Sequence, residues 1–591
     1  MFNGKHGMPS VNQASSRRLV ILAKVDNLAS AVENSRIWPL AIFLAIYFPL
    51  TAFLASRKLI WDDEFFTLYI SRSGSMSEIL KALATGADQH PPLFYFLVHQ
   101  ITAIFGPSHL SFRLAAIFGY GLFCICVFFL LRNRTSVLWA TVGMFLPLVA
   151  VPAYYYATEA RGYSLVLGFC SLALLSWQRA AVREMRLGWL CVLFSALAMA
   201  VASHYYAVLF LIPLCVGELT RTYLLKRIDA PVWLSFCGVA IPPFLFLSTI
   251  RDARHYSSHF WAIPYWSKIV EFYPTYLGTP TTIFLLGLLV YLISRLWLAP
   301  QSSGVHEADV AASPPPAWEI VTCIAIAAIP LFAMELAKRV THGYVERYAI
   351  HALIGAVLII CYAGFHSARR SRIIPFFLAV MFLIFFGLQA VLLVRTNSIR
   401  LFGLIADMTF LAPHTGQPVA LADATVFHQV SFYARREFQR NFAYLCDPDQ
   451  SVRYLGQDTI DRGLLDLLPW FPLNAVERAR YENEHSEFLA YGLVNEWNWI
   501  TFFFTAPSYN SRVLARNGGR LLLRIERSAP ISASPQPARY PAVRERLFDR
   551  MPTSGPSLCE EWFPGDSLCA AVGQKFAATN NQSNYLNPPS R

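Results

Sequence analysis

The sequence WDDEFFTLYI at residues 61–70, followed by DQHPPLFY at 88–95, is the stretch that decides the fold. Its three acids at 62–64 come shortly after a first apolar run at 37–56, which has about the 20 residues that a membrane-spanning helix needs. Carboxylates are costly at a membrane boundary unless they bind a cation, take up a proton or pair with a base. An acidic cluster in this place therefore indicates chemistry at the end of a membrane span.

The composition of the whole chain is that of a polytopic membrane protein. Of its 591 residues, 55% are hydrophobic and only 15% are charged, whereas soluble domains carry about 25% charged residues. The net charge of +12 reports mainly loop charge and anionic partners in such a protein. No basic and aromatic nucleic-acid motif occurs, so no nucleic-acid partner is expected. The 11 cysteines fall mostly in apolar runs and form no CxxC pair, which argues against a cysteine metal site.

Apolar runs of about the spanning length recur along the chain and predict about eleven transmembrane helices. The runs lie at 37–56, 113–131, 136–153, 163–178, 187–203, 205–220, 231–250, 279–297, 318–336, 349–365 and 374–394. No small-residue cleavage site follows the first run, so we expect an uncleaved span and not a signal peptide. The run at 91–106 is short and carries polar residues, which favours an interfacial helix in the first outer loop.

Positive charges predict the orientation of these helices. Lys and Arg favour cytoplasmic loops, and with 91–106 at the interface they place the N-terminal tail in the cytoplasm. Every polar cluster of interest then falls on the opposite, outer face. These clusters lie at 62–64, 90, 159–161, 204–206, 251–259 and 346–347. Scattered structural polar residues would not sort to one face so consistently, so the pattern predicts a single outward-facing active site.

The chain divides by composition into four parts. They are a cytoplasmic tail at 1–36, a transmembrane catalytic domain at 37–395, a soluble domain at 396–527 and a Pro/Ser-rich tail at 528–591. A Ser-, Ala- and Pro-rich stretch at 298–317 is expected to be a cytoplasmic linker.

The soluble domain is predicted to be a small α/β unit on the outer side of the membrane. Strand-like runs alternate with helix-like segments such as 426–436 and 458–468. The strand-like runs are 418–422, 442–446, 488–492 and 520–525. Beyond residue 528 the chain is expected to be disordered or loosely attached. Cys559 and Cys569 in that tail could pair in an oxidising compartment, and the sequence leaves their pairing open.

The acids and the histidine of the deciding stretch each have a functional and a structural interpretation. The acids at 62–64 could take a proton from an acceptor hydroxyl or hold a divalent cation. They could equally cap the end of the first span beside Arg57 and Lys58. His90 precedes two prolines in a stiff turn, where its ring could ligate a metal or contact a phosphate. A histidine there is more often a helix-entry residue.

The later clusters are weaker when they are taken singly. Glu159 and Arg161 could pair at the membrane interface, or the arginine could grip a phosphate with both arms of its guanidinium. Arg347 is either a snorkelling anchor at the end of a span or the partner of a lipid-linked phosphate. Interfacial aromatic residues and a basic loop near lipid headgroups explain most of the remaining candidates. The candidates for a pocket are Glu159, Tyr163, His204, Tyr205 and Arg254.

The order of these pieces along the chain is more specific than any one of them. HPPLFY at 90–95 is followed by FGPSHLSFRLAAIFG at 105–119, EARGYSLVL at 159–167, HYYAVL at 204–209 and ERYAI at 346–350. Together with the preceding Asp-Glu pair, this series resembles the polyprenyl-phosphate-sugar-dependent glycosyltransferases of GT-C architecture. That family includes bacterial relatives of the protein O-mannosyltransferases and of the lipid A aminoarabinose transferase. The resemblance covers about residues 37–395, and the soluble tail is placed as in many members.

The resemblance implies a GT-C fold and assigns roles to several residues. Asp63 of the Asp-Glu pair matches the base or acceptor-orienting group, with Glu64 in support. Asp62 is an extra acid before the pair, so the choice between the two aspartates stays open. Arg347 matches the family's late arginine, expected near the lipid phosphate, and Arg161 of the EAR step is a second phosphate-binding candidate.

A metal site is left open by the same comparison. His90 stands where relatives place a phosphate-contacting or metal-contacting residue. Some relatives have Glu-Lys there, and this chain has Gln89-His90. The cofactor is therefore unknown, with a divalent cation as the candidate and Glu64 and His90 as its candidate ligands.

The implied reaction is an inverting transfer of a monosaccharide from a polyprenyl-phosphate donor to a hydroxyl on the outer face of a bacterial inner membrane. Glycolipid, polysaccharide and protein hydroxyls all remain open as acceptors, and so does the identity of the sugar. The competing interpretations are a transporter or flippase of a lipid-linked sugar, an O-antigen-ligase-like glycan transferase and a non-enzymatic scaffold. A flippase would be expected to show broken helices at mid-membrane and paired halves, and the sequence shows neither clearly.

Overall fold

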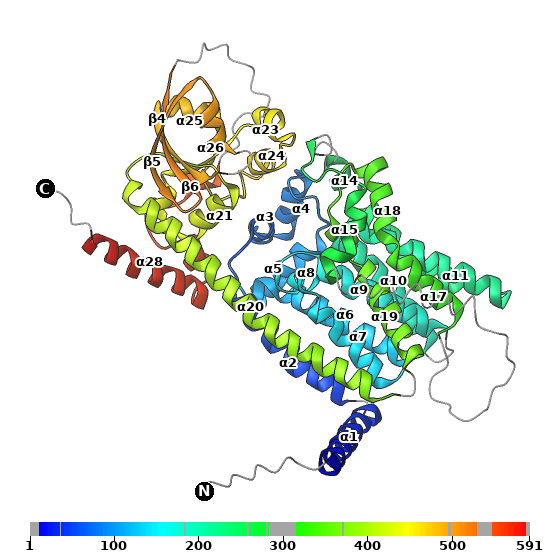
Figure 1. The fold of residues 1–591 in the computed structure, drawn as a ribbon. Helices are drawn as coiled ribbons and strands as arrows, with labels where there is room; N and C mark the ends of the chain where they lie inside the picture. The colour runs from blue at the N-terminus through cyan, green and yellow to red at the C-terminus, as the bar shows by residue number, and fades with distance from the viewer. Residues whose placement is uncertain are drawn as a thin grey trace, which may run out of the picture.

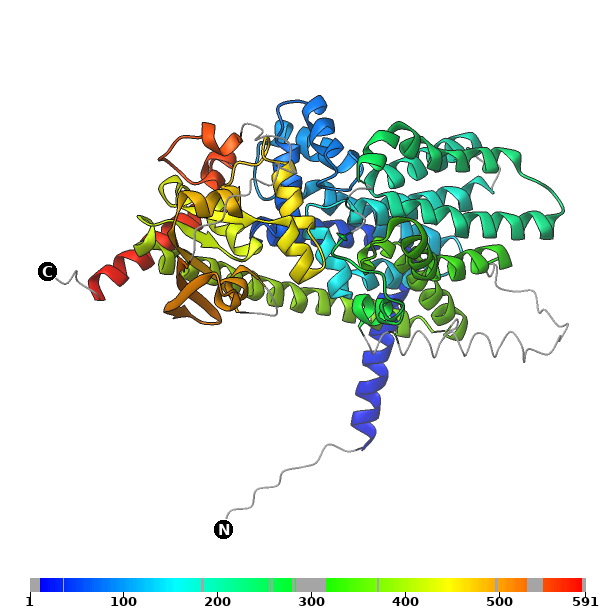
Figure 2. The same ribbon diagram turned by 90° about the horizontal axis from the view of Figure 1, so that it is seen from above.

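A long helix joins a helical membrane part to a soluble α/β domain in the computed structural model of the protein (Figure 1, and from above in Figure 2). The structure describes residues 11–35, 37–181, 185–253, 256, 259–278, 282, 315–368, 371–494, 498–528 and 546–586. The linking helix, α20 (Ile373–Leu411), has 39 residues, which corresponds to about 58 Å. It lies beside α2 in the membrane part and beside α28 at the soluble domain (Figure 1).

Helices make up the described membrane part. The first group is α1 (Val11–Asn34), α2 (Trp38–Ser56), α3 (Asp62–Ser71), α4 (Met76–Ala84), α5 (Leu93–Phe105), α6 (Leu114–Arg132), α7 (Val137–Val149), α8 (Val151–Tyr155) and α9 (Tyr163–Ala180). The second group is α10 (Arg186–Ser203), α11 (Leu211–Leu225), α12 (Ala230–Phe236), α13 (Ile241–Leu245), α14 (Leu247–Ala253), α15 (Ser267–Leu277), α17 (Ala317–Ala327), α18 (Ile329–Leu336) and α19 (Ala352–Ser367).

Five of the described helical stretches are long and apolar enough to cross a membrane, or seven if each of two bent pairs forms one span. The pair α7 and α8 bends by 74°, and the pair α17 and α18 bends by 46°. Pro152 and Pro330 stand at the first turns of α8 and α18. A proline lacks the N–H that would continue the preceding helix, which explains a break at each point. The predicted span at 279–297 and most of the linker at 298–317 lie outside the described residues, so the count of eleven stays a prediction.

The first outer loop folds into three short helices, α3, α4 and α5. The three acids at 62–64 occupy the first turn of α3, where carboxylates interact favourably with the helix dipole. Helix α5 has 13 residues, or about 20 Å, and the hydrocarbon core of a bilayer is about 30 Å thick. Its length agrees with the interfacial helix expected at 91–106.

Glycines bring α6 and α9 into close backbone contact. A Cβ on Gly119 would lie 2.7 Å from the backbone nitrogen of Leu165, and a Cβ on Gly168 would lie 2.5 Å from the carbonyl oxygen of Gly119. Small residues permit this approach between membrane helices. The contact fixes the first turns of α9, which Tyr163 begins and Arg161 precedes, against α6.

The soluble domain contains a mixed six-stranded sheet with the strand order β3-β2-β1-β4-β6-β5. The strands are β1 (Val419–Leu421), β2 (Phe442–Cys446), β3 (Ala475–Glu477), β4 (Glu487–Leu493), β5 (Tyr509–Asn517) and β6 (Arg520–Arg527). Neighbours among β1 to β4 pair in parallel, and β5 and β6 form an antiparallel hairpin beside β4. The helices are α21 (Ala424–Tyr433), α22 (Arg436–Gln439), α23 (Pro448–Leu455), α24 (Thr459–Asp466), α25 (Arg478–Glu484) and α26 (Trp499–Thr505).

The α/β prediction for this domain is confirmed, and its four predicted strands correspond to β1, β2, β4 and β6. Strands β3 and β5 were not predicted. The first has only three residues, and the second has mostly exposed side chains, so neither produces the apolar alternation of a half-buried strand.

The end of the chain is better ordered than the Pro/Ser-rich composition suggested. Within the described residues 546–586, the helices α27 (Leu558–Trp562) and α28 (Ser567–Leu586) pack into the same apolar core as α21 and the first outer loop. Cys559 and Cys569 form a disulfide with a Cα–Cα distance of 5.6 Å, which answers the pairing left open by the sequence. Apolar anchors such as Leu558 and Phe563 correct the expectation of a loosely attached tail for these residues.

The disulfide gives a first testable prediction. Closing a loop of this size removes conformational entropy from the unfolded chain. The folded state is thereby stabilised by about 2–3 kcal/mol. Replacing both Cys559 and Cys569 by serine is therefore expected to make the segment at 546–586 more sensitive to limited proteolysis, with cleavage followed by mass spectrometry. The variant Cys446→Ser, which changes a buried free thiol, is the control. Equal cleavage rates for the double variant and the wild type would contradict the expected stabilisation.

Candidate active site

An ion pair between Asp63 and Arg347 lies at the centre of the polar cluster. The two residues are 284 positions apart in sequence, and Nη2 of Arg347 donates to Oδ2 of Asp63 at 2.8 Å. Asp63 comes from the first turn of α3, and Arg347 comes from the short helix Glu346–Ala349 that precedes α19. Their side chains are 29% and 18% exposed, so solvent and ligands can reach the pair.

Aromatic rings hold the guanidinium of Arg347 from the other sides. Its Cζ atom lies 5.6 Å from the ring centroid of Tyr163 and 5.7 Å from that of Trp261, within the range of cation–π attraction. Its Nε atom is buried and has no hydrogen-bond partner among the described residues. The arginine is therefore held in place while part of its donor capacity stays unused.

A second group of charges joins Arg161, Asp88 and His90. Nη1 of Arg161 lies 2.6 Å from Oδ2 of Asp88, and Nη2 lies 3.2 Å from Oδ1. Nδ1 of His90 lies 2.8 Å from Oδ1 of the same carboxylate, and Nε2 lies 3.3 Å from the hydroxyl oxygen of Tyr163. Burial opposes ionisation of Asp88, but Arg161 outweighs it and holds the pKa of this carboxyl well below its usual range. Burial, together with Arg161, lowers the pKa of His90, so a neutral imidazole is favoured.

Stacked rings connect this second group to the later segments of the chain. The ring centroids of His90 and His204 are 4.9 Å apart, and those of His204 and Tyr348 are also 4.9 Å apart. Burial lowers the pKa of His204 well below the usual value, and His90 adds to the effect. The sequence had pointed to Tyr205, but it is Tyr206 whose ring joins the cluster, at 5.0 Å from Tyr348. No ring contact of Tyr205 with these residues occurs in the part of the chain that the structure describes.

Glu64 takes no part in the exposed cluster, which corrects the expectation that it supports Asp63 or binds a metal. It is fully buried, and its oxygens accept from Nε and Nη2 of Arg113 at 2.8 and 2.7 Å and from the amide of Ala160 at 2.7 Å. Burial alone would raise the pKa of Glu64, but Arg113 and Lys58 lower it to about 2. Both carboxylate oxygens are occupied by protein donors, so the residue acts as a structural tie between α3, α6 and the start of α9.

Glu159 belongs to the same buried network and not to an open pocket. One of its oxygens lies 3.9 Å from Nζ of Lys58, and both side chains are almost completely buried. Burial raises the pKa of Glu159 to about 7 despite the lysine, with Glu64 and Asp63 adding to the rise. Lys58 also donates to the carbonyl of Thr158 at 3.1 Å, so it anchors the segment that leads into Arg161.

Asp62 faces the soluble domain. Its Oδ2 accepts a hydrogen bond of 2.5 Å from the hydroxyl of Thr425 at the start of α21, and its Oδ1 has no partner among the described residues. Burial raises the pKa of Asp62 to about 7, with Asp63 and Asp423 contributing and Thr425 opposing. The two aspartates thus have different partners: Asp63 meets the arginine, and Asp62 meets the soluble domain.

The soluble domain contacts the site from two sides. Beyond the bond from Thr425, Nε2 of Gln429 donates to the carbonyl of Ile60 at 3.1 Å. On the other side, the amide of Asp458 donates to the carbonyl of His259 at 3.3 Å. His259 is two residues before Trp261, whose ring contacts Arg347. The domain therefore supports the segment that leads into Asp63 and the segment whose Trp261 contacts Arg347.

The raised pKa of Asp62 predicts a pH dependence of stability. An aspartate in the unfolded chain ionises near pH 4, so between about pH 4 and 7 the folded protein binds the extra proton. Its stability therefore falls as the pH rises through that window and no longer changes from this cause above it. The variant Asp62→Asn is expected to show a flatter fall of the thermal midpoint between pH 4 and 7, measured in detergent. Parallel curves for the variant and the wild type would contradict the assignment.

The pocket candidate Arg254 lies outside the described residues.

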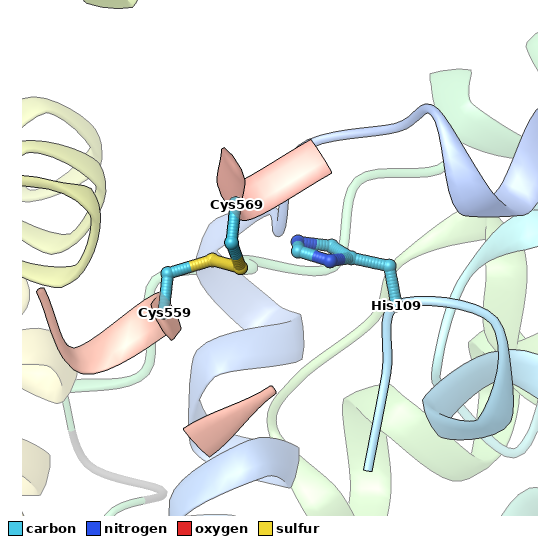
Figure 3. A group of neighbouring side chains, drawn as sticks. All are labelled: His109, Cys559 and Cys569. Carbon is cyan, nitrogen blue, oxygen red and sulfur yellow. A yellow bond between two sulfur atoms is a disulfide. The ribbon is translucent and has the colours of Figure 1, made fainter. Parts of the chain in front are cut away.

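His109, Cys559 and Cys569 are the one group of three possible metal ligands whose ligand atoms lie close together within the described ranges (Figure 3). Its two sulfur atoms are bonded to each other, so neither offers a thiolate. Nδ1 of His109 lies instead 3.0 Å from a carboxylate oxygen of Asp566.

The metal ligands proposed from the sequence do not form a set. Glu64 is tied to Arg113, and His90 turns Nδ1 to Asp88. The divalent cation stays a prediction.

The helix ends that supply the cluster define the class of protein. Asp63 follows the C-terminal end of α2, Arg161 precedes α9, His204 follows α10 and Arg347 precedes α19. Ends of alternating direction meet at one face of the bundle, beneath the soluble domain. The chain is a multi-pass membrane protein with one composite polar site, and the sequence prediction that these distant clusters meet agrees with the observed contacts.

Comparisons with known proteins specify the class. Residues 89–244 match the family described as dolichyl-phosphate-mannose-protein mannosyltransferase. The chain is similar to the crystal structure of ArnT from Cupriavidus metallidurans bound to undecaprenyl phosphate, with 14% identity and a TM-score of 0.51, over 83% of this chain and 98% of that one. ArnT from the same organism in the apo state gives 13% identity and a TM-score of 0.51, over 82% and 97%. No match is found among curated protein sequences.

The chain therefore has the GT-C fold, and the match over residues 89–244 agrees with the resemblance inferred from its motifs. The family match begins at Gln89 and ends within α13, so it includes His90, Arg161 and His204. Asp63 and Arg347 lie outside it and enter the site through the geometry alone.

Proposed function

We propose that the protein transfers a monosaccharide from a polyprenyl-phosphate donor to a hydroxyl acceptor, with inversion at the anomeric carbon. The observation that carries this proposal is the contact of 2.8 Å between Asp63 and Arg347, whose side chains are partly exposed. A carboxylate can receive a proton from a hydroxyl, and an arginine can hold a phosphate. The ArnT structure with undecaprenyl phosphate supports a lipid of this type as the donor carrier.

The proposed step needs one base and one anion-binding group. The acceptor oxygen forms a bond to the anomeric carbon while the bond from that carbon to the phosphate oxygen breaks. The hydroxyl proton passes to Asp63, and the electron pair of the broken bond leaves with the polyprenyl phosphate. Arg347 is positioned to meet the negative charge that develops on the leaving phosphate, and such stabilisation is often the largest single contribution to catalysis.

The remaining polar residues are proposed to position these two groups. Arg161 binds Asp88, and Asp88 in turn contacts Nδ1 of His90. These contacts fix the ring of His90 beside Tyr163. The neutral imidazoles of His90 and His204 form the polar lining beside them and add no charge. The acceptor is a hydroxyl on a glycolipid, a polysaccharide or a protein.

We further propose that the site faces the periplasm, with the protein in the inner membrane. The disulfide between Cys559 and Cys569 favours an oxidising compartment for the soluble domain. The domain contacts Asp62 directly, so the site and the disulfide lie on the same side of the membrane. A lipid-linked donor suits this compartment because nucleotide sugars are scarce there.

Sugar transfer by wild-type protein and by Asp63→Asn tests the function directly. Purified protein in liposomes is supplied with radiolabelled polyprenyl-phosphate sugars and with envelope glycolipid, polysaccharide or protein fractions. The wild type is expected to form a new glycosidic bond, and Asp63→Asn is expected to lower the rate by about 100-fold or more, as for loss of a general base.

Other outcomes would identify the competing functions. Movement of the labelled lipid across the bilayer without a new bond would indicate a flippase. Transfer of a preassembled glycan in place of a single sugar would indicate a ligase. Unchanged transfer by Asp63→Asn, Asp62→Asn and the double variant would remove the base assignment.

A further inference from the structure

Arg347 has a guanidinium nitrogen that makes no hydrogen bond to the described residues. Its Nη2 is bonded to Asp63, and its neighbouring Nε is buried with no partner among the described residues. Nε and Nη2 point along the same edge of the guanidinium and together form the fork that binds two oxygens of one anion. Oδ2 of Asp63 thus contacts one nitrogen of this edge, and the other nitrogen, Nε, has no partner among the described residues.

The Nε atom of Arg161 is also buried without a partner among the described residues, but its two Nη atoms differ from those of Arg347. Both of its Nη atoms are engaged by the two oxygens of Asp88, at 2.6 and 3.2 Å, and Nη1 also bonds to Thr67. Its side chain is more deeply buried than that of Arg347. Of the two arginines, Arg347 is thus the one that can accept an incoming anion without losing a complete bidentate pair.

We infer that a lipid-linked phosphate and the carboxylate of Asp63 compete for the Nε and Nη2 edge of Arg347, so that donor binding releases Asp63. This inference rests on the proposed function. Nη2 already contacts Oδ2 of Asp63 at 2.8 Å, so a phosphate on Nε and Nη2 would lie beside this carboxylate, and two anions so close repel each other. The carboxylate then loses its hydrogen bond to Arg347, so both of its oxygens can receive the proton of an incoming hydroxyl.

The competition orders the reaction. Without the donor, Oδ2 of Asp63 is held by Arg347, so it is not free to receive the proton of an acceptor hydroxyl. With the donor bound, the same carboxylate is free on a first-turn position of α3, one residue from the anchored Asp62. The base is therefore active only when a sugar is present to be attacked.

The same competition helps to reset the site. After transfer, the acceptor proton resides on Asp63, and the polyprenyl phosphate, now a monoester with one more ionisable oxygen, remains on Arg347. A neutral carboxyl cannot displace it. Once the proton passes to solvent, the charged carboxylate again competes for Nη2 and promotes release of the product lipid.

The test measures equilibrium binding of undecaprenyl phosphate, without turnover, to the full-length protein in detergent micelles. Asp63→Asn removes the competing charge and keeps the side-chain volume, so it is expected to bind undecaprenyl phosphate about three- to tenfold more tightly than the wild type. Asp63→Glu keeps the charge and is expected to bind with an affinity close to that of the wild type. The tightening is opposite to the loss of transfer expected for the same Asn variant.

Two controls separate direct competition from a general change in charge. Asp62→Asn, measured at pH 8 where Asp62 is mostly ionised, removes a neighbouring charge that is bonded to Thr425 and is expected to change the affinity less. In the Arg347→Ala background, adding Asp63→Asn is expected to cause no tightening. This comparison completes a double-mutant cycle, which isolates the coupling between the two residues. Phosphatidic acid is measured in parallel, and a tightening of equal size for it would show that the site takes any lipid phosphate monoester.

The results that overturn the two proposals differ. If the wild type binds undecaprenyl phosphate and Asp63→Asn binds it equally or more weakly, the competition is excluded and the proposed function stands. If the wild type does not bind undecaprenyl phosphate or any polyprenyl-phosphate sugar, the proposed donor fails. Thermal midpoints of all variants are recorded, and Asp63→Glu provides a charge-preserving comparison if the Asn variant is unstable.

Discussion

Replacing Arg347 by alanine is expected to lower kcat/KM for sugar transfer by about 1,000-fold, the size typical for loss of a group that stabilises developing charge. The residue meets Asp63 through one donor and has another free, and the rings of Tyr163 and Trp261 hold it in place. Arg347→Lys is expected to recover only part of the rate, because an ammonium provides the charge without the two-armed geometry. The measurement is the initial rate of labelled sugar transfer in proteoliposomes.

A matched arginine on the same part of the chain provides the control. Arg339 is 78% exposed and pairs with Glu335 one turn earlier. The variant Arg339→Ala changes the same charge eight residues away and is expected to leave the transfer rate unchanged. Equal losses for both alanine variants would attribute the effect to net charge and contradict the role of Arg347.

Breaking the ion pair of Glu64 and Arg113 is expected to have the largest effect on stability. Both side chains are fully buried, and Arg113 also donates to the carbonyls of Ala55, Lys58 and Leu59. Removing one partner leaves an uncompensated buried charge, which typically costs about 3–5 kcal/mol. Glu64→Gln or Arg113→Met is therefore expected to unfold at a much lower temperature than the wild type in detergent.

The double variant distinguishes a structural tie from a catalytic group. Glu64→Leu combined with Arg113→Met leaves no unpaired charge and is expected to recover part of the lost stability. The pair Glu78 and Lys81, at 2.6 Å but on the surface, serves as a control, and Glu78→Gln is expected to have no measurable effect. A stable Glu64→Gln variant that has lost all transfer would reverse the interpretation and return Glu64 to the chemistry.

Sequence patterns predicted the parts of this protein that depend on local properties. Apolar runs marked the spans, and alternation with helical periodicity marked the α/β domain. Motif order identified Asp63, His90, Arg161 and Arg347, and the structure brings these residues and their partners to one face of the bundle. The signal was strong because a charged residue at a membrane boundary needs a partner, and few such residues occur.

The partners themselves could not be predicted because they are set by tertiary contacts. Asp88 stands two residues before His90 but gives no sign in sequence that it binds Arg161, 73 positions later. Thr425 lies 363 positions from Asp62 and has no charge to attract attention. Arg113 could have been suspected, since an arginine buried in the mostly apolar sequence SFRLAAIFG at 111–119 requires a counter-charge. Glu64 was given a catalytic role because its neighbours in sequence suggested one, although its side chain turns away from theirs.

The uninterrupted helix α20 sets the orientation of the soluble domain relative to the membrane part. Each residue of an α-helix advances the chain by about 1.5 Å and turns it by about 100°. One residue gained or lost near Thr396 would swing everything beyond it through more than a quarter of a circle, and Thr425 would then no longer reach Asp62. A soluble domain could thus be exchanged between distant relatives only if the number of residues in the linking helix keeps the same orientation. This holds even where the exchanged surfaces are compatible.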